Sequence, residues 1–170
     1  MHETDTKWLV LRAQAGDREA LEALLERAQQ PLYRYLAHVL ADAALAEDVL
    51  QDVLFRIYRK LIWLREPALF PAWAFRIASR AAFRKLKKMK RLKEEPLVDD
   101  VVQIENIQPL VDALPAHLEA LSPASRGVVA LHYLEGLSLQ EVADVLAIPL
   151  GTAKSRLAYG LRRLREALES

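Results

Sequence analysis

Residues 138–170 read SLQEVADVLAIPLGTAKSRLAYGLRRLREALES, and the interpretation of the whole chain starts from this stretch. Ser138 and Glu141 have the spacing of a capping box, which predicts a short helix with one apolar inner face. The segment 147–151 predicts a tight turn, and Thr152 is placed to cap the helix that follows. The residues expected on the inner face of the short helix are Leu139, Val142, Ala143 and Leu146.

The second helix of this pair combines an apolar stripe with a basic remainder. Its leucines recur at spacings of four, three and four, at Leu157, Leu161, Leu164 and Leu168. Two helices joined by a tight turn form a helix-turn-helix, whose second helix enters the DNA major groove. The residues expected near base edges are Lys154, Ser155 and Arg156, and those expected near phosphates are Arg162, Arg163 and Arg165. The alternative is a helical hairpin whose basic face is merely solvated.

Composition excludes several classes of protein. The chain has 170 residues, of which 52% are hydrophobic, enough for one domain or two small ones. It contains no cysteine, which excludes disulfides and thiolate metal sites and indicates a reducing compartment. Residues 1–17 have no signal-peptide pattern, and no stretch approaches the ~20 apolar residues that span a bilayer. We therefore expect a cytoplasmic protein without membrane insertion.

The net charge of +1 conceals a separation of charge along the chain. Residues 76–93 carry nine Lys or Arg and no acid, whereas residues 94–112 carry six acids and no base. This pattern predicts a basic surface for a polyanion, followed by an acidic segment that the same polyanion repels. Pro96 and Pro109 favour an extended linker over residues 94–112.

Helices account for the first part of the chain. Residues 5–41 have helical periodicity with a break at Gly16 and Asp17, and Pro31 is expected to start a further helix. Residues 43–63 form the next helix. Phe55 lies opposite its inner face, among charged residues, and is either a protein-binding anchor or covered by a neighbouring helix. The inner face comprises Ala46, Val49, Leu50, Val53, Ile57 and Leu61.

Pro67 and Pro71 interrupt the pattern before a basic helix. Like charges recur along it every three to four residues, which destabilises a helix unless an anion binds. Aromatic residues beside such a helix can stack on unpaired bases, although core packing is the commoner role for Trp73. The aromatic residues are Phe70, Trp73 and Phe75, and the cations are Arg76, Arg80, Arg84, Lys87, Lys88 and Arg91.

A second set of helices is predicted after the linker, over residues 114–121 and 124–134. Ser122 and Pro123 favour the start of the latter helix, and Gly136 favours its end. The predicted fold is therefore all-α, with two small helical domains, residues 1–93 and 113–170, joined by the acidic linker 94–112. The C-terminal domain contains the helix-turn-helix.

Four motifs occur in order along the chain, and together they resemble a family. They are AEDVLQDV at 46–53, FPAWAFRIA at 70–78, LEGLS at 134–138 and IPLGTAKSRL at 148–157. The chain resembles a bacterial sigma factor of the extracytoplasmic-function (ECF) type, group IV of the sigma-70 family, over nearly its whole length. The resemblance implies a subunit that binds core RNA polymerase and directs promoter recognition, DNA melting and transcription initiation. It implies neither catalysis nor a cofactor.

The resemblance also assigns roles to residues. The face that docks on the clamp helices of the largest polymerase subunit would comprise Asp48, Gln51, Asp52, Phe55 and Arg59. The loop 65–71 would help to capture a flipped base of the minus-ten element. The residues contacting that element would be Phe70, Trp73, Arg76, Arg80, Arg84, Lys87, Lys88 and Arg91. The residues contacting the minus-thirty-five element would be Thr152, Lys154, Ser155, Arg156 and Arg162.

Further implications concern the linker, the regulator and the promoter. The acidic linker would thread through the polymerase cleft in place of nucleic acid, and an anti-sigma factor or other external regulator would control the protein.

The family usually has Asn where Arg80 stands and often Arg where Tyr159 stands. Both departures bear on which promoter is read.

Other classes of function fit less well. A free-standing transcriptional regulator would use only the C-terminal helix-turn-helix, and tight promoter binding without polymerase would favour it. An enzyme is disfavoured because the histidines are scattered and neither a metalloprotease motif nor a phosphate-binding glycine loop is present. These histidines are His2, His38, His117 and His132. We expect no metal site and no cofactor.

Overall fold

The computed structural model describes residues 3–89 and 108–170, and within these ranges all regular elements are helical. The first half contains α1 (Glu3–Gln14), α2 (Arg18–Leu40), α3 (Ala43–Lys60) and α4 (Phe70–Lys88), with 3-10 turns at Leu61–Trp63 and Pro67–Leu69. The second half contains α5 (Gln108–His117), α6 (Pro123–Val129), α7 (Leu139–Leu146) and α8 (Leu150–Glu169), with a 3-10 turn at Leu118–Ala120 and a π turn at Ala130–Leu134. The predicted all-α fold is confirmed.

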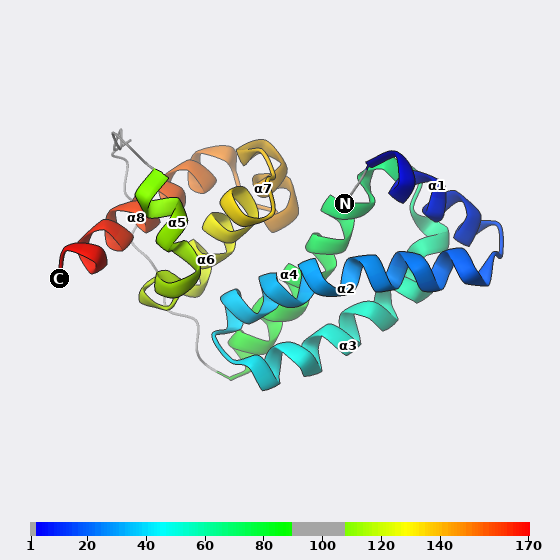
Figure 1. Cartoon of the computed structure of the whole chain (residues 1–170), viewed down its shortest axis with the longest axis horizontal. Coiled ribbons are helices and arrows are strands. Elements are labelled where there is room, and N and C mark those ends of the chain that lie inside the picture. The colour runs from blue at the N-terminus through cyan, green and yellow to red at the C-terminus, as the bar shows by residue number, and fades with distance from the viewer. Residues whose placement is uncertain (1–2, 90–107) are drawn as a thin grey trace.

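The helices of the first half pack around α2, which contacts α1, α3 and α4 (Figure 1). The predicted inner face of α3 is buried, each of its residues being at most 5% exposed. The predicted break before α2 is also confirmed, because the carboxylate of Asp17 accepts a hydrogen bond from the backbone N–H of Ala20. Asp42 caps α3 in the same way through the N–H of Leu45.

The expectation that Pro31 starts a new helix is wrong, because α2 continues through it. A proline inside a helix cannot donate the usual backbone hydrogen bond. The neighbouring residues Ala28 and Leu32 are at most 2% exposed. Burial of this apolar face stabilises the continuous helix despite the missing bond.

In the second half, α8 packs against α5, α6 and α7. Leu157, Leu161 and Leu164 are buried as predicted, whereas Leu168 is 41% exposed near the end of the helix. The predicted end of the linker is wrong, because residues 108–112 belong to α5. Proline is tolerated in a first helical turn, where its missing N–H has no helical partner to lose, so Pro109 does not mark a linker. Linker residues 94–107 lie outside the described residues.

The predicted helix 124–134 is divided into α6 and a π turn. Ser122 caps α6 by accepting a hydrogen bond from the N–H of Ser125 at 3.2 Å. Gly136 ends the segment with φ of +75°, a conformation that glycine adopts without a steric penalty. The π turn that results from this division belongs to the part of the second half that contacts α2.

The helix-turn-helix has the predicted elements with one correction. The capping box is present, since Ser138 and Glu141 exchange both hydrogen bonds, and Ala147 ends α7 in the left-handed conformation. The prediction that Thr152 caps α8 is wrong. The helix begins at Leu150, directly after Pro149, so Thr152 lies inside its first turn.

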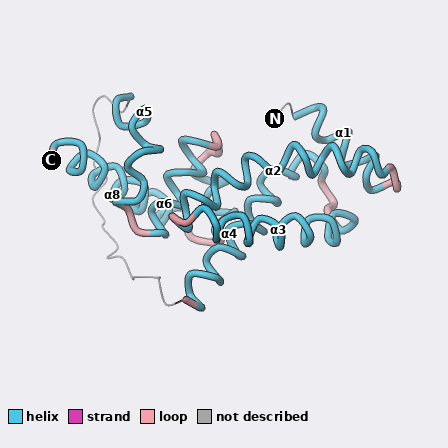
Figure 2. The backbone as a smooth tube through the Cα atoms, turned by 60° about the horizontal axis from the view of Figure 1, so that its bottom comes forward, coloured by secondary structure: helices cyan, strands magenta, loops and turns pink. Residues whose placement is uncertain are grey.

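The two halves contact each other through α4 and α7, and through α2 with α6 and the π turn (Figures 1 and 2). Their buried residues belong to one continuous apolar cluster. Val145 was not predicted to be buried, because it lies roughly 100° away from the inner face of α7 on a helical wheel. It is only 1% exposed, as expected for a helix that is covered on a second side.

Candidate functional site

The predicted docking face on α3 is open to solvent. Asp48, Gln51, Asp52, Phe55 and Arg59 are all exposed, and the ring of Phe55 is 58% exposed. The guanidinium of Arg59 lies 5.8 Å from the centre of the Phe55 ring, close enough for a cation–π contact. Of the two interpretations of Phe55, burial by a neighbouring helix is therefore excluded within this structure. An exposed aromatic ring among charges is typical of a protein-binding anchor.

A groove of about 830 Å³ adjoins this face. Its wall includes Trp63, which is 79% exposed and was not singled out from the sequence. Its exposure depends on the 3-10 turn after α3, which the helical periodicity does not reveal. The groove is lined by Asp52, Phe55, Arg56, Arg59, Lys60, Trp63 and Trp73. It therefore combines aromatic surface with cationic groups, the two features that bind unpaired nucleotides.

The two aromatic residues assigned to minus-ten contacts differ in position. Phe70 is fully buried, so its ring supports the start of α4 from inside and is not available to a base. Phe70 is the first residue of α4 and lies four residues before Ala74 and eight before Ala78 on the buried side of the helix, so the helical period itself indicates its burial. Trp73 lies 6.0 Å from Phe70, between ring centres, and is half-buried. One part of Trp73 packs against the core and another lines the groove, so its structural and surface roles coexist.

The cations of α4 form an open row along its exposed side. Arg80, Arg84, Lys87 and Lys88 are exposed, and none of them is paired with a carboxylate in the described part of the chain. The apolar residues of the helix face α2 and α3, with Ala78, Ala82 and Leu86 at most 1% exposed. This arrangement fits the binding of an extended polyanion.

Two of the predicted cations do not join the row. Arg76 is half-buried, and its Nε atom is buried without a hydrogen-bond partner in the described structure. Arg91 lies outside the described residues. Lys85, which was not predicted, is 3.9 Å from the carboxylate of Asp48 and links the row to the docking face.

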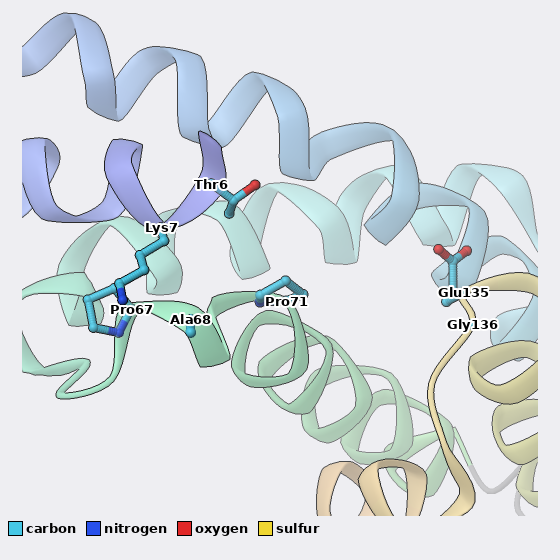
Figure 3. Close-up of a pocket in the computed structure, with 7 residues that line it drawn as sticks. All are labelled: Thr6, Lys7, Pro67, Ala68, Pro71, Glu135 and Gly136. Carbon is cyan, nitrogen blue, oxygen red and sulfur yellow. The ribbon is translucent and has the colours of Figure 1, made fainter. Parts of the chain in front are cut away.

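A pocket of about 300 Å³ lies beside the loop 65–71 (Figure 3). The 3-10 turn Pro67–Leu69 contributes Pro67 and Ala68, the first turn of α4 contributes Pro71, and α1 contributes Thr6 and Lys7. No local pattern predicts that α1 contributes to this pocket, because α1 is distant from these residues in the chain. The remaining wall comes from the second half, from Glu135 and Gly136.

The predicted DNA-reading residues lie near the start of α8. Lys154 is exposed, and Thr152, Ser155 and Arg156 are half-exposed. Because α8 starts at Leu150, Lys154 and Arg156 lie in its second turn rather than its first. The Ser155 hydroxyl donates a hydrogen bond to the carbonyl of its own helix at residue 151, at 3.0 Å. A hydroxyl held in this way supports the helix.

The cations further along α8 have partners within the helix. The guanidinium of Arg162 lies 5.5 Å from the ring centre of Tyr159, and Arg163 pairs with Glu166 at 2.8 Å. Neither Lys154 nor Arg156 is paired with a carboxylate in the described ranges. The charges that remain open on α8 are therefore concentrated toward its N-terminal end.

Within residues 3–89 and 108–170, no group of three His, Cys, Asp or Glu side chains could hold a metal ion. Each helix in these two ranges is too short or too polar to span a bilayer.

Comparisons with known proteins match both halves in order. Residues 24–92 match the family described as Sigma-70 region 2, and residues 117–166 match Sigma-70, region 4. An RNA polymerase sigma-E factor of Streptomyces avermitilis is 32% identical over 91% of this chain and 88% of its own length. ECF RNA polymerase sigma factor SigE of Mycolicibacterium smegmatis is 28% identical over 90% of this chain, which spans 64% of that relative.

Solved structures support the same fold. The sigma factor RpoE in complex with the anti-sigma factor NepR, from Bartonella quintana, has a TM-score of 0.68 at 22% identity. The alignment covers 87% of this chain and 96% of that one. At this identity the similarity concerns the fold alone.

Proposed function

We propose, from the premise that this chain belongs to the ECF group of the bacterial sigma-70 family, that its two halves read two parts of one promoter. The chain is an RNA polymerase sigma factor that directs promoter recognition and transcription initiation, and it is not an enzyme. The single observation that carries this assignment is the occurrence of region 2 and region 4, in this order, on one chain. A free-standing regulator would not require region 2.

The exposed face of α3 is the proposed docking surface for core RNA polymerase. Its support is the open Phe55 ring with Asp52 and Arg59 around it. Interface anchors combine a large apolar contact with nearby charges that orient the partner. The face is already exposed in the free chain, so docking requires no rearrangement of α3.

The proposed strand-binding surface comprises α4 and the loop before it. Arg80, Arg84, Lys87 and Lys88 would contact phosphates of the opened non-template strand, because they form one row and have no carboxylate partner among the residues that the structure describes. Trp73 and the loop 65–71 would contact bases. Phe70 is not part of this proposal, because it is buried. Its role is to hold the loop in place.

The start of α8 is the proposed reader of the upstream duplex. Lys154 and Arg156 would contact base edges in the major groove of the minus-thirty-five element, and Arg162 would lie near phosphates. Ser155 and Thr152 would contribute polar contacts from the same end of the helix.

The domains would comprise residues 1–93 and 108–170. The second domain would thus begin at the start of α5.

The cellular setting follows from the family. Core RNA polymerase is cytoplasmic in bacteria, so we place this chain there. The structure from Bartonella quintana contains an anti-sigma factor. By analogy, an anti-sigma protein or another external regulator is the proposed inhibitory partner of this chain.

Run-off transcription tests the proposed function. Purified core polymerase is incubated with genomic DNA fragments, with and without the chain, and the 5′ ends of the transcripts are mapped. We expect a defined set of new start sites, each preceded by shared minus-ten and minus-thirty-five sequences. Unchanged start sites in the presence of a polymerase-bound chain would contradict the proposal.

A further inference from the structure

The segment that joins α3 to α4, residues 61–69, consists mainly of two short 3-10 turns. Each turn has a local backbone hydrogen bond of 3.0 Å, from the N–H of Leu64 to the carbonyl of Leu61 and from the N–H of Leu69 to the carbonyl of Glu66. These bonds set the shape of each turn, but they do not set where the segment lies on the domain. That position has to come from contacts with other elements.

Gln14, the last residue of α1, makes such a contact. Its Nε2 atom donates a hydrogen bond of 2.8 Å to the carbonyl of Leu61 and one of 2.7 Å to the carbonyl of Leu64. A carboxamide nitrogen has two N–H groups, so a single side chain satisfies both carbonyls. The half-buried Gln14 therefore fixes both ends of the first 3-10 turn to α1.

The end of α1 is itself held in place. Nε of Arg12 donates a hydrogen bond of 2.8 Å to the carboxylate of Asp17, and the same carboxylate caps α2 through the N–H of Ala20. The N–H of Asp17 also donates to the carbonyl of Arg12 at 3.0 Å. A side chain positions its neighbours only when its own backbone is supported. Gln14 lies between Arg12 and Asp17, so it has this support.

The first turns of α1 meet the other part of the segment. α1 contacts the second 3-10 turn, and Thr6 and Lys7 line one pocket together with Pro67 and Ala68 (Figure 3). α1 thus runs along the whole segment, with Thr6 beside the second turn and Gln14 on the first. The contact of Gln14 fixes the point at which the loop 65–71 leaves α3.

We infer that Gln14 is a positioning residue for base recognition, because it holds the loop 65–71 where that loop meets an unpaired base of the minus-ten element. The inference rests on the proposed function, which assigns the loop to that base. Gln14 itself touches no base. A loop that is already in place binds without the cost of being ordered, and a small displacement of a binding group weakens selection.

Variants of Gln14 separate its hydrogen bonds from its shape. Gln14→Met keeps the length of the side chain but removes the donors, and Gln14→Lys restores N–H donors. Met, Lys and Gln have similar helix propensities, so α1 should form in both variants. Gln14→Asn is a milder change, because the shorter side chain does not reach both carbonyls. Tyr35→Phe is the matched control, since it removes a buried hydrogen bond between α2 and α4 in the same half.

Hydrogen exchange followed by NMR on the free chain measures whether Gln14 holds the segment. We expect the N–H of Leu64 to exchange about tenfold faster in Gln14→Met, because two hydrogen bonds of ordinary strength are lost locally. Gln14→Asn should show a smaller increase, and Gln14→Lys and Tyr35→Phe should show the rate of the parent. Unchanged protection of Leu64 in Gln14→Met would overturn the positioning role.

Transcription then measures the choice of base. Core polymerase with each variant transcribes a barcoded promoter library that is randomised over the minus-ten and minus-thirty-five elements. We expect Gln14→Met to lose about fivefold or more of its preference at a minus-ten position, because the loop is displaced, and to keep its minus-thirty-five preference. Gln14→Lys should recover the minus-ten preference, and Tyr35→Phe should keep both preferences.

The control and the rescue decide between positioning and general stability. Faster exchange at Leu64 with an unchanged minus-ten preference would overturn the inference. An equal loss of preference in Tyr35→Phe would do the same, because it would show an effect of stability alone. Failure of Gln14→Lys to restore both readouts would exclude the hydrogen bonds as the cause.

Mapping of start sites separates this inference from the proposed function. A parent chain that redirects start sites, with a minus-ten preference that does not depend on Gln14, would overturn only the positioning role. A chain in which Gln14 protects Leu64 as expected, but which leaves start sites unchanged, would overturn the proposed function instead.

Discussion

α4 and α8 are both basic helices, but their charges are arranged differently. On α4, four exposed cations follow one another without carboxylate partners in the described structure, and the last turn contains Lys85, Lys87 and Lys88. Cations there are also stabilised by the helix dipole, so those in the last turn have a structural explanation besides DNA binding. On α8, Arg162 and Arg163 are engaged within the helix.

The difference predicts different kinds of recognition. A row of open charges suits phosphates, which carry no sequence information, whereas the two free cations near the start of α8 suit base edges. Changes on α4 should therefore alter affinity and its salt dependence for all promoters alike. Changes on α8 should alter the choice among promoters. The predictions below test this division.

The largest effect is expected on α3, because under the proposed function both basic helices reach the promoter only after this face has bound polymerase. Asp52→Ala with Phe55→Ala should weaken binding to core RNA polymerase by about 100-fold or more, since truncation of central anchors costs at least about 2 kcal/mol each. Fluorescence anisotropy of the labelled chain with purified core polymerase measures this.

The control for this pair is Leu11→Ala, which truncates another exposed apolar residue on α1. We expect it to bind polymerase normally. Circular dichroism should show native helix content for both proteins, because Asp52 and Phe55 are exposed. Normal polymerase affinity of the double variant would remove the docking surface from the proposal.

The next largest effect is expected at the start of α8. Lys154→Ala and Arg156→Ala should each reduce discrimination among upstream sequences by about 1 to 3 kcal/mol, the usual value of a direct base contact. A promoter library transcribed in vitro measures discrimination. Arg163→Ala is the control, because Arg163 is paired with Glu166. If the ranking of promoters stays unchanged, shape rather than base edges is read at this position.

A smaller and less selective effect is expected on α4. Arg84→Gln and Lys88→Gln should each reduce the slope of log affinity against log salt by roughly one, because each removes a phosphate contact. The loss should be similar across the promoter library. Arg18→Gln, on a surface pair with Glu22 away from α4, is the control. A sequence-selective loss at Arg84 or Lys88 would break the division between the helices.

Most of the fold follows from local patterns in the sequence. The period of α3 and the capping box before α7 depend on neighbouring residues alone, so both were predictable. The errors at Pro31 and Pro109 have a common cause, whereas the error at Thr152 arises because α8 begins earlier than expected, directly after Pro149. A proline is compatible with a helix when packing or its place in the first turn offsets the missing N–H, and local patterns do not show which case applies.

The candidate site was only partly predictable, because turns and contacts between distant segments place some of its residues. Phe55 is exposed as its helical wheel suggested, and the burial of Phe70 follows the regular spacing of the inner face of α4. The exposure of Trp63, by contrast, depends on the 3-10 turn after α3. The contact between Arg34 and Glu135 joins residues that are 101 positions apart. Pairing over such a distance has no local signal, because it arises from tertiary packing.

The smallest effect is expected inside the first half, at the hydrogen bond that fixes α4 to α2. The hydroxyls of Tyr35 and Ser79 are 2.7 Å apart and both side chains are buried. Tyr35→Phe would leave Ser79 without this partner, so the free energy of unfolding at pH 7 should fall by about 1 to 2 kcal/mol. Urea unfolding followed by circular dichroism measures it. Tyr58→Phe, on a ring that is 54% exposed, should change it little.

The same variant has a pH signature that sharpens the test. Burial raises the pKa of Tyr35, so the folded state keeps the phenol proton at pH values where the unfolded chain loses it. This contribution to stability is complete below about pH 10, the ordinary tyrosine value, and decreases as the pH rises toward the folded value. The parent should therefore lose up to about 1.4 kcal/mol more per pH unit than Tyr35→Phe above pH 10. A constant difference between the two proteins from pH 8 to pH 11 would mean that the phenol is hydrated, and that α4 is less firmly held than its buried face indicates.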